Sequence, residues 1–336
     1  MNKITILGGG GWAIALAVLL DGNGHKVTIW SKLEKEIQAL TNERENKNSL
    51  PGVIIPESID INADIADAVS DADIIVMAVA SSFMRSTAEL LKGKIKDGQV
   101  IINVAKGIED KTLFTMTDVL EDVLPECEAC VLSGPSHAEE VGRKLPTTIV
   151  VGAKKEETAL FIQKVFSNNY FRVYISSDIT GIEIGGSLKN VIALAAGIAD
   201  GLGYGDNSKA ALITRGIKEI ADLGTKMGCK IGTFAGLSGM GDLIVTCASM
   251  HSRNRRAGIL IGQGKSLEEA INEVHMVVEG AVSAKAALAL AQKYNVELPI
   301  IEQVNKVLFE GKSADEAVKE LMNREFKSEY LDITWN

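Results

Sequence analysis

The first half of the chain alternates short, β-branched apolar runs with segments of helical periodicity. The apolar runs predict seven strands, at residues 3–8, 26–30, 73–79, 99–105, 129–134, 147–153 and 170–176. Their centres are apolar at consecutive positions rather than at alternate ones, which is typical of strands covered on both faces. Strands that alternate with helices in this way predict βαβ units and a doubly wound α/β sheet that is mostly parallel.

The second half differs, because strand patterns disappear after about residue 181. Helical periodicity dominates from there to the end, interrupted by glycine-rich turns at 200–207 and 234–242. A chain of 336 residues is also too long for one ordinary small domain. We therefore predict an α/β domain at residues 1–180 and an all-helical domain at residues 181–336, with the boundary near Thr180.

Composition narrows the possible partners and the location. The net charge of −9 argues against a general nucleic-acid or membrane-surface binder, so an anion site must come from a local basic cluster. The N-terminus has the charge-then-apolar pattern of a signal peptide, but four glycines interrupt it and no convincing cleavage site follows. The longest apolar runs fall short of the roughly 20 residues that span a bilayer. We expect a cytoplasmic protein without membrane insertion.

The cysteines and histidines do not predict a metal site. Cys127 and Cys130 form one C-x-x-C pair, but no second pair with metal-ligand spacing exists, and the four histidines are scattered. We expect ordinary reduced thiols and no bound metal.

The N-terminal strand runs directly into a glycine cluster that opens a helix. Gly8, Gly10 and Ala13 occupy the three small positions of the G-x-G-x-x-G/A pattern. Backbone N–H groups at such a helix start hold a pyrophosphate. The pattern therefore predicts a Rossmann-type dinucleotide-binding domain, the alternative being a merely flexible strand–helix turn.

The end of the second predicted strand bears on the choice of cofactor. An enzyme strict for NAD usually carries Asp or Glu there to hold the ribose 2′-hydroxyl. Ser31 and Lys32 stand there instead, and neither repels a 2′-phosphate. This favours NADP(H), or the use of both cofactors, with an ordinary surface lysine as the alternative for Lys32.

Lys189 stands inside an almost wholly apolar run, residues 183–198. Its neighbours on the same helical stripe would be Gly185, Gly186, Ile192 and Ala193. None neutralises a charge, so burial should lower the pKa of Lys189 toward working pH, which suits a proton donor and acceptor. The two glycines should leave room for a substrate against the backbone. The alternative is a lysine that reaches along the apolar surface to water.

Asp242, at the end of the turn GLSGMGD, is the acid we expect beside Lys189. Glu183 is six residues from Lys189, about 240° around a helix, so it does not face the lysine. Asp242 could also be a helix N-cap, a role compatible with a catalytic one. Thr246, one turn after Asp242, and Asn190 beside Lys189 are candidates for hydrogen bonds to a substrate.

Several stretches together are much more distinctive than the glycine loop. They are NERENKNSLPG, VAKGIE, LSGPSHAEEV, GIEIGGSLKNVIALAAGIADGLGYGDNSKAALITRG and GDLIVTCASMHSRNRR. From about residue 4 to 290 the chain resembles the bacterial-type NAD(P)-dependent glycerol-3-phosphate dehydrogenase family. The resemblance implies a Rossmann domain followed by a helical domain. It also implies interconversion of dihydroxyacetone phosphate and sn-glycerol 3-phosphate, which supplies the backbone of phospholipids.

The same resemblance assigns residues to each part of the site, with Lys189 and Asp242 as the catalytic pair. Substrate contacts are expected from Lys106, Gly134, Ser136, Lys189, Asn190, Asp242, Thr246, Ser252, Arg253 and Asn254. Cofactor contacts are expected from Gly8, Gly10, Gly11, Trp12, Ala13, Ser31, Lys32, Lys106, Ala138, Arg253, Val277 and Glu279. Arg253 suits a phosphate because a guanidinium bonds it bidentately. Each assignment has a plain alternative. Lys106, Gly134 and Ser136 could be an ordinary surface lysine and turn, and Glu279 could be a solvated carboxylate.

The glycine loop departs from the family pattern G-x-G-[SA]-W-G-T. Here Gly11 loses a side chain that commonly lies near the cofactor phosphates, whereas Ala13 and Ile14 add bulk. Alanine at the third small position still fits the general fingerprint, so we expect the fold and cofactor binding to survive.

Two other functions remain open at this point. One is a reductase of another small oxo acid, which would give Arg253 a different anion to bind. The other is a non-catalytic dinucleotide sensor, which the joint presence of Lys106, Lys189, Asp242 and Arg253 disfavours because a sensor needs no proton donor. The expected partner is a small-molecule substrate, and a homodimer stays open.

Overall fold

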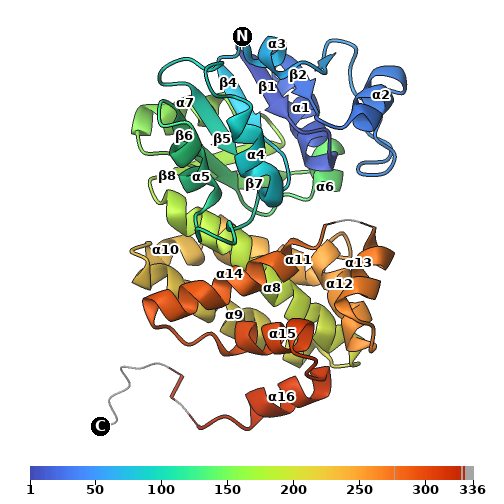
Figure 1. Ribbon diagram of the computed structural model, residues 1–336, viewed down its shortest axis with the longest axis vertical. Helices are drawn as coiled ribbons and strands as arrows, with labels where there is room; N and C mark the ends of the chain where they lie inside the picture. Colours follow the sequence, from blue (N-terminus) through green and yellow to red (C-terminus); the bar gives the residue numbers. More distant parts are fainter. Residues whose placement is uncertain (276, 327, 330–336) are drawn as a thin grey trace.

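The computed structural model describes residues 1–275, 277–326 and 328–329. An α/β part formed by the first half of the chain stands on an all-helical part formed by the second (Figure 1). This is the predicted fold class, a mostly parallel sheet with helices followed by a helical domain.

One eight-stranded sheet forms the centre of the α/β part, in the order β3-β2-β1-β4-β5-β6-β7-β8. The strands are β1 (Lys3–Leu7), β2 (Lys26–Trp30), β3 (Asp60–Asn62), β4 (Ile74–Met77), β5 (Val100–Asn103), β6 (Glu128–Ser133), β7 (Thr147–Gly152) and β8 (Phe171–Ser176). Neighbouring strands are parallel except β6 and β7, which are antiparallel. All seven predicted strands are present. The edge strand β3 has no counterpart in the prediction, because its three residues contain one apolar side chain.

Helices cover both faces of the sheet, as the continuous apolar strand centres predict. In this part they are α1 (Gly11–Gly22), α2 (Glu34–Asn42), α3 (Ile65–Val69), η1 (Ser81–Phe83), α4 (Met84–Glu89), α5 (Met116–Val123), α6 (Ala138–Gly142) and α7 (Glu156–Phe166). One core packs α1 and α7 on the sheet, and a second core packs α3, α4 and α5 on the opposite face.

The helical part is built around α8 (Ile179–Gly201), which is buried over nearly its whole length. The other helices are α9 (Asp206–Lys226), α10 (Ile231–Phe234), η2 (Leu237–Gly241), α11 (Asp242–Ala248), α12 (Arg253–Gly262), α13 (Leu267–Val274), α14 (Glu279–Tyr294), α15 (Pro299–Phe309) and α16 (Ala314–Met322). The Asp178 side chain caps α8 by accepting from Gly181 N at 3.1 Å.

Glycines let α12 approach α8 backbone to backbone. A Cβ on Gly197 of α8 would collide with the carbonyl of Arg255, and one on Gly258 of α12 would collide with the carbonyl of Leu194. This close contact fixes the start of α12, where Arg253 and Asn254 stand, beside the middle of α8.

Two segments of the described residues are long and apolar enough to cross a membrane by composition alone, 179–201 and 231–248. The apolar window of the first is entirely buried inside the protein, and 39% of the second is. Enclosure of the first by other helices is the arrangement of a core helix.

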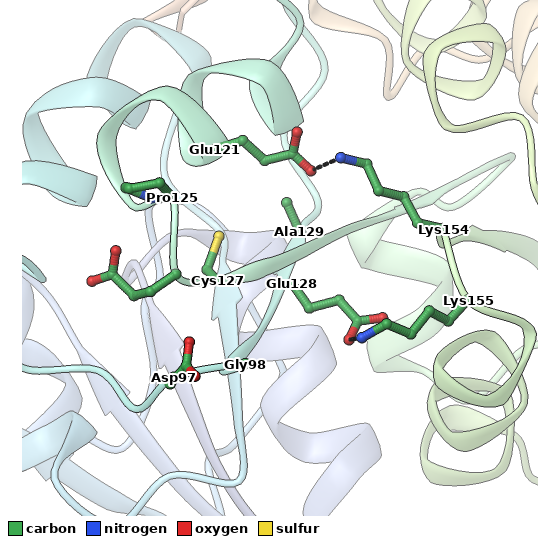
Figure 2. A pocket seen from close by; sticks show the side chains of 10 residues that line it. Asp97, Gly98, Glu121, Pro125, Cys127, Glu128, Ala129, Lys154 and Lys155 are labelled. Carbon is green, nitrogen blue, oxygen red and sulfur yellow. Dashed lines mark hydrogen bonds and ion pairs between the residues drawn. The ribbon is translucent and has the colours of Figure 1, made fainter.

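A surface hollow lies at the amino ends of β5 and β6, near Gly98 and Glu128 (Figure 2). Its lysines pair with its acids: Lys154 contacts Glu121 at 2.5 Å and Lys155 contacts Glu128 at 2.7 Å. Cys127 and Cys130 are free, and burial raises the pKa of each thiol to about 12, so both stay protonated. The described residues contain no group of three or more His, Cys, Asp or Glu that could hold a metal ion.

Candidate active site

The glycine loop has the geometry that a pyrophosphate requires. Gly8 has φ +135°, and a Cβ there would lie 2.5 Å from the carbonyl oxygen of Ala78. Around Gly10 a Cβ would meet nothing within 4 Å, so the backbone is open on that side. Gly10 caps α1 without a side-chain hydrogen bond, and the first turn holds no acid. The N–H groups and positive end of α1 are therefore available to an anion, and the loop fits a dinucleotide.

Gly9 and Gly11, which lie outside the three small positions of the fingerprint, make room for other parts of the chain. A Cβ on Gly11 would lie 2.5 Å from the carbonyl oxygen of Ser49, and one on Gly9 would lie 2.6 Å from Oε2 of Glu36. Asn46 Nδ2 also donates to the carbonyl of Gly9 at 3.0 Å. The departure at Gly11 thus has a structural cause, because the segment after α2 packs directly on the loop.

Other residues predicted for the cofactor lie around this loop. Ala13 is fully buried in the core, and Trp12 packs against its edge. Ala138 begins α6, which packs against α1. Lys32 is exposed, whereas Ser31 is buried and its Oγ donates to Glu36 Oε2 at 2.5 Å.

Glu36 is a residue that sequence reasoning missed. The motif directs attention to the strand end itself, whereas Glu36 reaches back from the first turn of α2, five residues further on.

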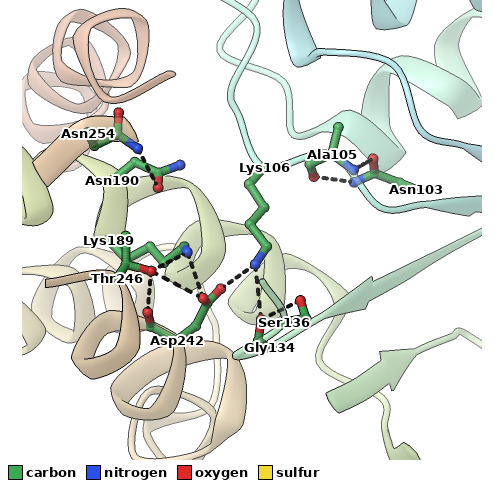
Figure 3. A network of polar contacts seen from close by, with 10 residues as sticks. All are labelled: Asn103, Ala105, Lys106, Gly134, Ser136, Lys189, Asn190, Asp242, Thr246 and Asn254. Carbon is green, nitrogen blue, oxygen red and sulfur yellow. Dashed lines mark hydrogen bonds and ion pairs between the residues drawn. The ribbon is translucent and has the colours of Figure 1, made fainter. Parts of the chain in front are cut away.

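Lys189 is buried in the middle of α8 with two polar partners from α11. Its Nζ donates to Asp242 Oδ1 and to Thr246 Oγ1, each at 2.6 Å (Figure 3). Burial lowers the pKa of Lys189 to about 8, against the effect of Asp242, which raises it, while Lys106 lowers it further. The pKa of Lys189 therefore lies closer to neutral pH than that of an ordinary lysine.

Asp242 joins Lys189 to a second lysine from the α/β part. Lys106 Nζ donates to Asp242 Oδ2 at 2.6 Å and to the carbonyl of Gly134 at 3.0 Å. Ser136 Oγ donates to the same carbonyl at 2.9 Å. Asp242 is the first residue of α11 and follows the π-helical turn η2, a feature often found at functional sites. The N-cap is Gly241, so Asp242 does not have the capping role that was the alternative.

The glycines before Lys189 do not leave room for a substrate, so this expectation is wrong. A Cβ on Gly185 would lie 2.7 Å from the carbonyl oxygen of Ser238, and one on Gly186 would lie 2.9 Å from Ser133 Oγ. Protein atoms fill both positions. The glycines instead let η2 and β6 approach α8, and this approach brings Asp242 to the lysine.

Glu183 faces away from Lys189, as the helical angle predicts. Its carboxylate accepts from Asn103 Nδ2 at 2.7 Å and from Thr117 N at 3.0 Å, both in the α/β part. Burial raises the pKa of Glu183 to about 7. Glu183 thus ties α8 to the sheet near the strand end that leads to Lys106.

The two asparagines lie together behind the lysine. Asn254 Nδ2 donates to Asn190 Oδ1 at 3.0 Å, and Asn254 Oδ1 accepts from Gly280 N at 2.8 Å. Ser252 caps α12 by accepting from Arg255 N at 3.2 Å. The Asn190 amide nitrogen forms no hydrogen bond to the described residues, so it remains able to donate to a ligand.

Arg253 and Glu279 stand at the starts of α12 and α14. The half-buried Arg253 guanidinium forms no hydrogen bond or ion pair within the described part of the chain. Burial raises the pKa of the Glu279 carboxyl, while Arg253, Lys189 and Lys106 lower it, so these charges share one region. The solvated carboxylate that was the alternative for Glu279 therefore does not describe its surroundings. Val277, also predicted to contact the cofactor, is 45% exposed.

His137 is a second site neighbour that sequence reasoning missed. Its buried Nε2 has no hydrogen-bond partner among the described residues. Burial lowers the pKa of His137, and the charges of Lys189 and Lys106 lower it further. Its place beside Ser136 is the only sequence signal.

Comparison with known proteins identifies the family. The model of the NAD-dependent glycerol-3-phosphate dehydrogenase N-terminus matches residues 3–159, and that of the C-terminus of the same family matches residues 178–319. The chain belongs to the NAD-dependent glycerol-3-phosphate dehydrogenase family. The predicted family, enzyme class and NAD(P) dependence are confirmed.

Relatives match this dehydrogenase over its whole length. A glycerol-3-phosphate dehydrogenase [NAD(P)+] of Fusobacterium nucleatum is 62% identical over 98% of this chain and 99% of its own. One of Agathobacter rectalis is 57% identical over the full length of both chains. The crystal structure of glycerol-3-phosphate dehydrogenase from Coxiella burnetii superposes with a TM-score of 0.93 at 34% identity, covering 96% of this chain and 99% of that one.

Proposed function

We propose that Lys189 supplies the proton when this chain reduces dihydroxyacetone phosphate to sn-glycerol 3-phosphate, and takes it back in the reverse reaction. This role is supported by the surroundings of Lys189, which is buried, donates hydrogen bonds to Asp242 and Thr246, and has its pKa lowered to about 8. Residues 1–180 then serve as the dinucleotide-binding domain and residues 181–336 as the substrate-binding and catalytic domain.

When bound at the glycine loop, the nicotinamide cofactor supplies the hydride that reaches the carbonyl carbon. Negative charge then develops on the carbonyl oxygen, and the Lys189 ammonium neutralises it by giving up a proton. Asp242 keeps that ammonium oriented. Lys106, held by the same carboxylate, adds a second positive charge from the opposite domain.

Arg253, Ser252 and Asn254 are proposed to hold the substrate phosphate, with Asn190 beside them. The support is that the Arg253 guanidinium forms no hydrogen bond or ion pair with the described residues, so its N–H donors remain available to an anion. A phosphate would satisfy them with bidentate, charge-assisted bonds.

The two rival functions fit these contacts less well. A dinucleotide sensor gives no reason to pair a buried Lys189 and a half-buried Lys106 with one aspartate between the domains. A reductase of an unphosphorylated oxo acid would leave the Arg253 region without its phosphate.

The test is the fall in absorbance at 340 nm with purified protein, NADH or NADPH, and dihydroxyacetone phosphate. Pyruvate, a 2-oxo acid, and unphosphorylated dihydroxyacetone serve as control substrates. Turnover that requires the phosphate supports the proposal. Equal turnover of the control substrates, or none with any substrate despite cofactor binding, contradicts it.

The remaining partners and the location are also proposals. We expect a cytoplasmic enzyme that neither inserts in membranes nor binds nucleic acid, in line with its net charge of −9. A homodimer is proposed because two-fold dimers are the commonest soluble oligomers. Light scattering after size exclusion measures the oligomeric state, and a monomer mass contradicts the dimer.

A further inference from the structure

The carboxylate of Glu36 lies between the end of β2 and the glycine loop. Gly8 N donates to the carbonyl of Trp30 at 2.7 Å, so the loop adjoins the strand end. Ser31, the residue after β2, donates its hydroxyl to Glu36 Oε2 at 2.5 Å. The same oxygen lies 2.6 Å from the place of a Cβ on Gly9. Glu36 therefore brings an acid to the strand end although the strand itself ends without one.

The Ser31 hydroxyl holds this carboxylate in one orientation. Ser31 Oγ also accepts from Leu33 N at 3.1 Å, so its single proton is directed to Glu36. Glu36 Oε1 forms no hydrogen bond among the described residues, and no lysine or arginine of that part of the chain comes within 4 Å of the carboxylate. One acceptor oxygen and the negative charge thus remain available to a ligand.

An acid at this place distinguishes the two dinucleotides. In dinucleotide-binding folds it accepts a hydrogen bond from the ribose 2′-hydroxyl of NAD. A carboxylate has no proton to donate to a 2′-phosphate and repels its charge. Lys32 and Lys35 are the nearby cations in sequence, and both are exposed and form no ion pair with Glu36. Neither is held beside the carboxylate, where its positive charge would offset this repulsion.

We propose that Glu36 reads the 2′ position of the cofactor, so that the chain binds NADH more tightly than NADPH. This reverses the expectation drawn from Ser31 and Lys32 alone. The inference rests on the proposed function only in placing a nicotinamide dinucleotide at the glycine loop. It concerns preference between the two cofactors, and NADPH remains a weaker ligand.

The experiment measures Kd for NADH and for NADPH on the purified full chain, by titration of the cofactor's own fluorescence. The wild type should bind NADH about tenfold more tightly, and Glu36→Gln should bring the two values within about threefold, mainly by tightening NADPH. Glu34→Gln is the matched control, because it removes the same charge from the same turn of α2. Among the described residues Glu34 bonds only Gln38, so the wild-type ratio should persist. Ser31→Ala should shift the ratio in the direction of Glu36→Gln by a smaller factor.

Two results would overturn the inference: a wild type that binds NADPH as tightly as NADH, or an affinity ratio that Glu36→Gln leaves unchanged. Reduction of dihydroxyacetone phosphate with both cofactors, run in parallel, separates this from the proposed function. The expected affinity ratio in a protein that does not reduce the substrate supports the inference and contradicts the proposed function. Turnover of dihydroxyacetone phosphate by a protein that binds NADH and NADPH equally supports the proposed function and contradicts the inference about Glu36.

Discussion

The two ends of the candidate active site are built in opposite ways. At the substrate end, Lys106, Lys189, Asp242 and Thr246 come from both domains and bond one another with little exposure to water. At the ribose end, the exposed Lys32 follows strand β2 and the half-buried Glu36 lies in the first turn of α2. The Ser31 hydroxyl is the only described side chain that holds the Glu36 carboxylate. At the substrate end the protein holds its charged groups in place before a ligand binds. At the ribose end a ligand must compete with water for groups that are held loosely.

Charges at the substrate end are costly to disturb, because removing one partner leaves others buried and unpaired. Charges at the ribose end are screened and lose little when a neighbour changes. We therefore expect large effects on chemistry from substitutions at the first end and smaller effects, confined to cofactor affinity, at the second.

The largest effect should come from Lys189→Met, which keeps the length and apolar bulk but removes the proton donor. Lys106 still pairs with Asp242, so the fold should survive while kcat falls by roughly 10²- to 10⁴-fold. Lys218→Met, an exposed lysine of α9, is the control and should be nearly silent. Near-normal kcat in a protein with an unchanged melting temperature would remove Lys189 from the mechanism.

Arg253→Ala should come next, at about 2–4 kcal/mol, or roughly 30- to 1,000-fold in kcat/KM for dihydroxyacetone phosphate. Activity on unphosphorylated dihydroxyacetone should change little, because it offers nothing for the guanidinium to hold. Arg172→Ala, on an exposed position of β8, is the control.

Because Arg253 is also expected near the cofactor, the affinity of Arg253→Ala for NADH is measured alongside. Equal losses on both substrates with intact cofactor binding would show that Arg253 does not recognise the phosphate.

The value of kcat/KM should depend on the protonation of Lys189 and change by about tenfold per pH unit on one side of its pKa. Reduction needs the ammonium, so its kcat/KM should be full below about pH 8 and fall above it; oxidation of glycerol 3-phosphate needs the neutral amine and should rise through the same pH. Cofactor affinity over pH 7–9.5 separates chemistry from binding. Parallel profiles in the two directions would assign the titration to another group.

The sequence predicted the buried end of the site better than the exposed end, and the physical reason is the cost of burying a charge. A lysine in an apolar run needs partners, which made Lys189 conspicuous and directed attention to Asp242 across 53 residues. A half-buried glutamate in the first turn of a short helix carries no such signal, so Glu36 was missed. Helical angles predicted that Glu183 faces elsewhere, but they could not show what fills the space beside Gly185 and Gly186.

The same reasoning applies to the fold. The seven apolar strands were predictable because burial on both faces leaves continuous apolar runs. The three-residue strand β3 is half-polar at the sheet edge and gives no such pattern. The antiparallel pairing of β6 and β7 was not predictable either, because a buried strand has the same composition in both directions.

The smallest effect should come from Lys32→Ala at the ribose end. Lys32 is exposed and forms no ion pair with the described residues, so any attraction to a 2′-phosphate is felt through water. At about 150 mM salt the screening length is roughly 8 Å, and such attraction should change the Kd for NADPH by less than about threefold. Lys35 is also exposed, so Lys35→Ala should have a similarly small effect. Both losses of affinity for NADPH should become smaller still as the salt concentration is raised. A loss of tenfold or more for Lys32→Ala that persists at high salt would mean that Lys32 binds the phosphate directly. The ribose end would then be as firmly built as the substrate end, and the contrast between the two would disappear.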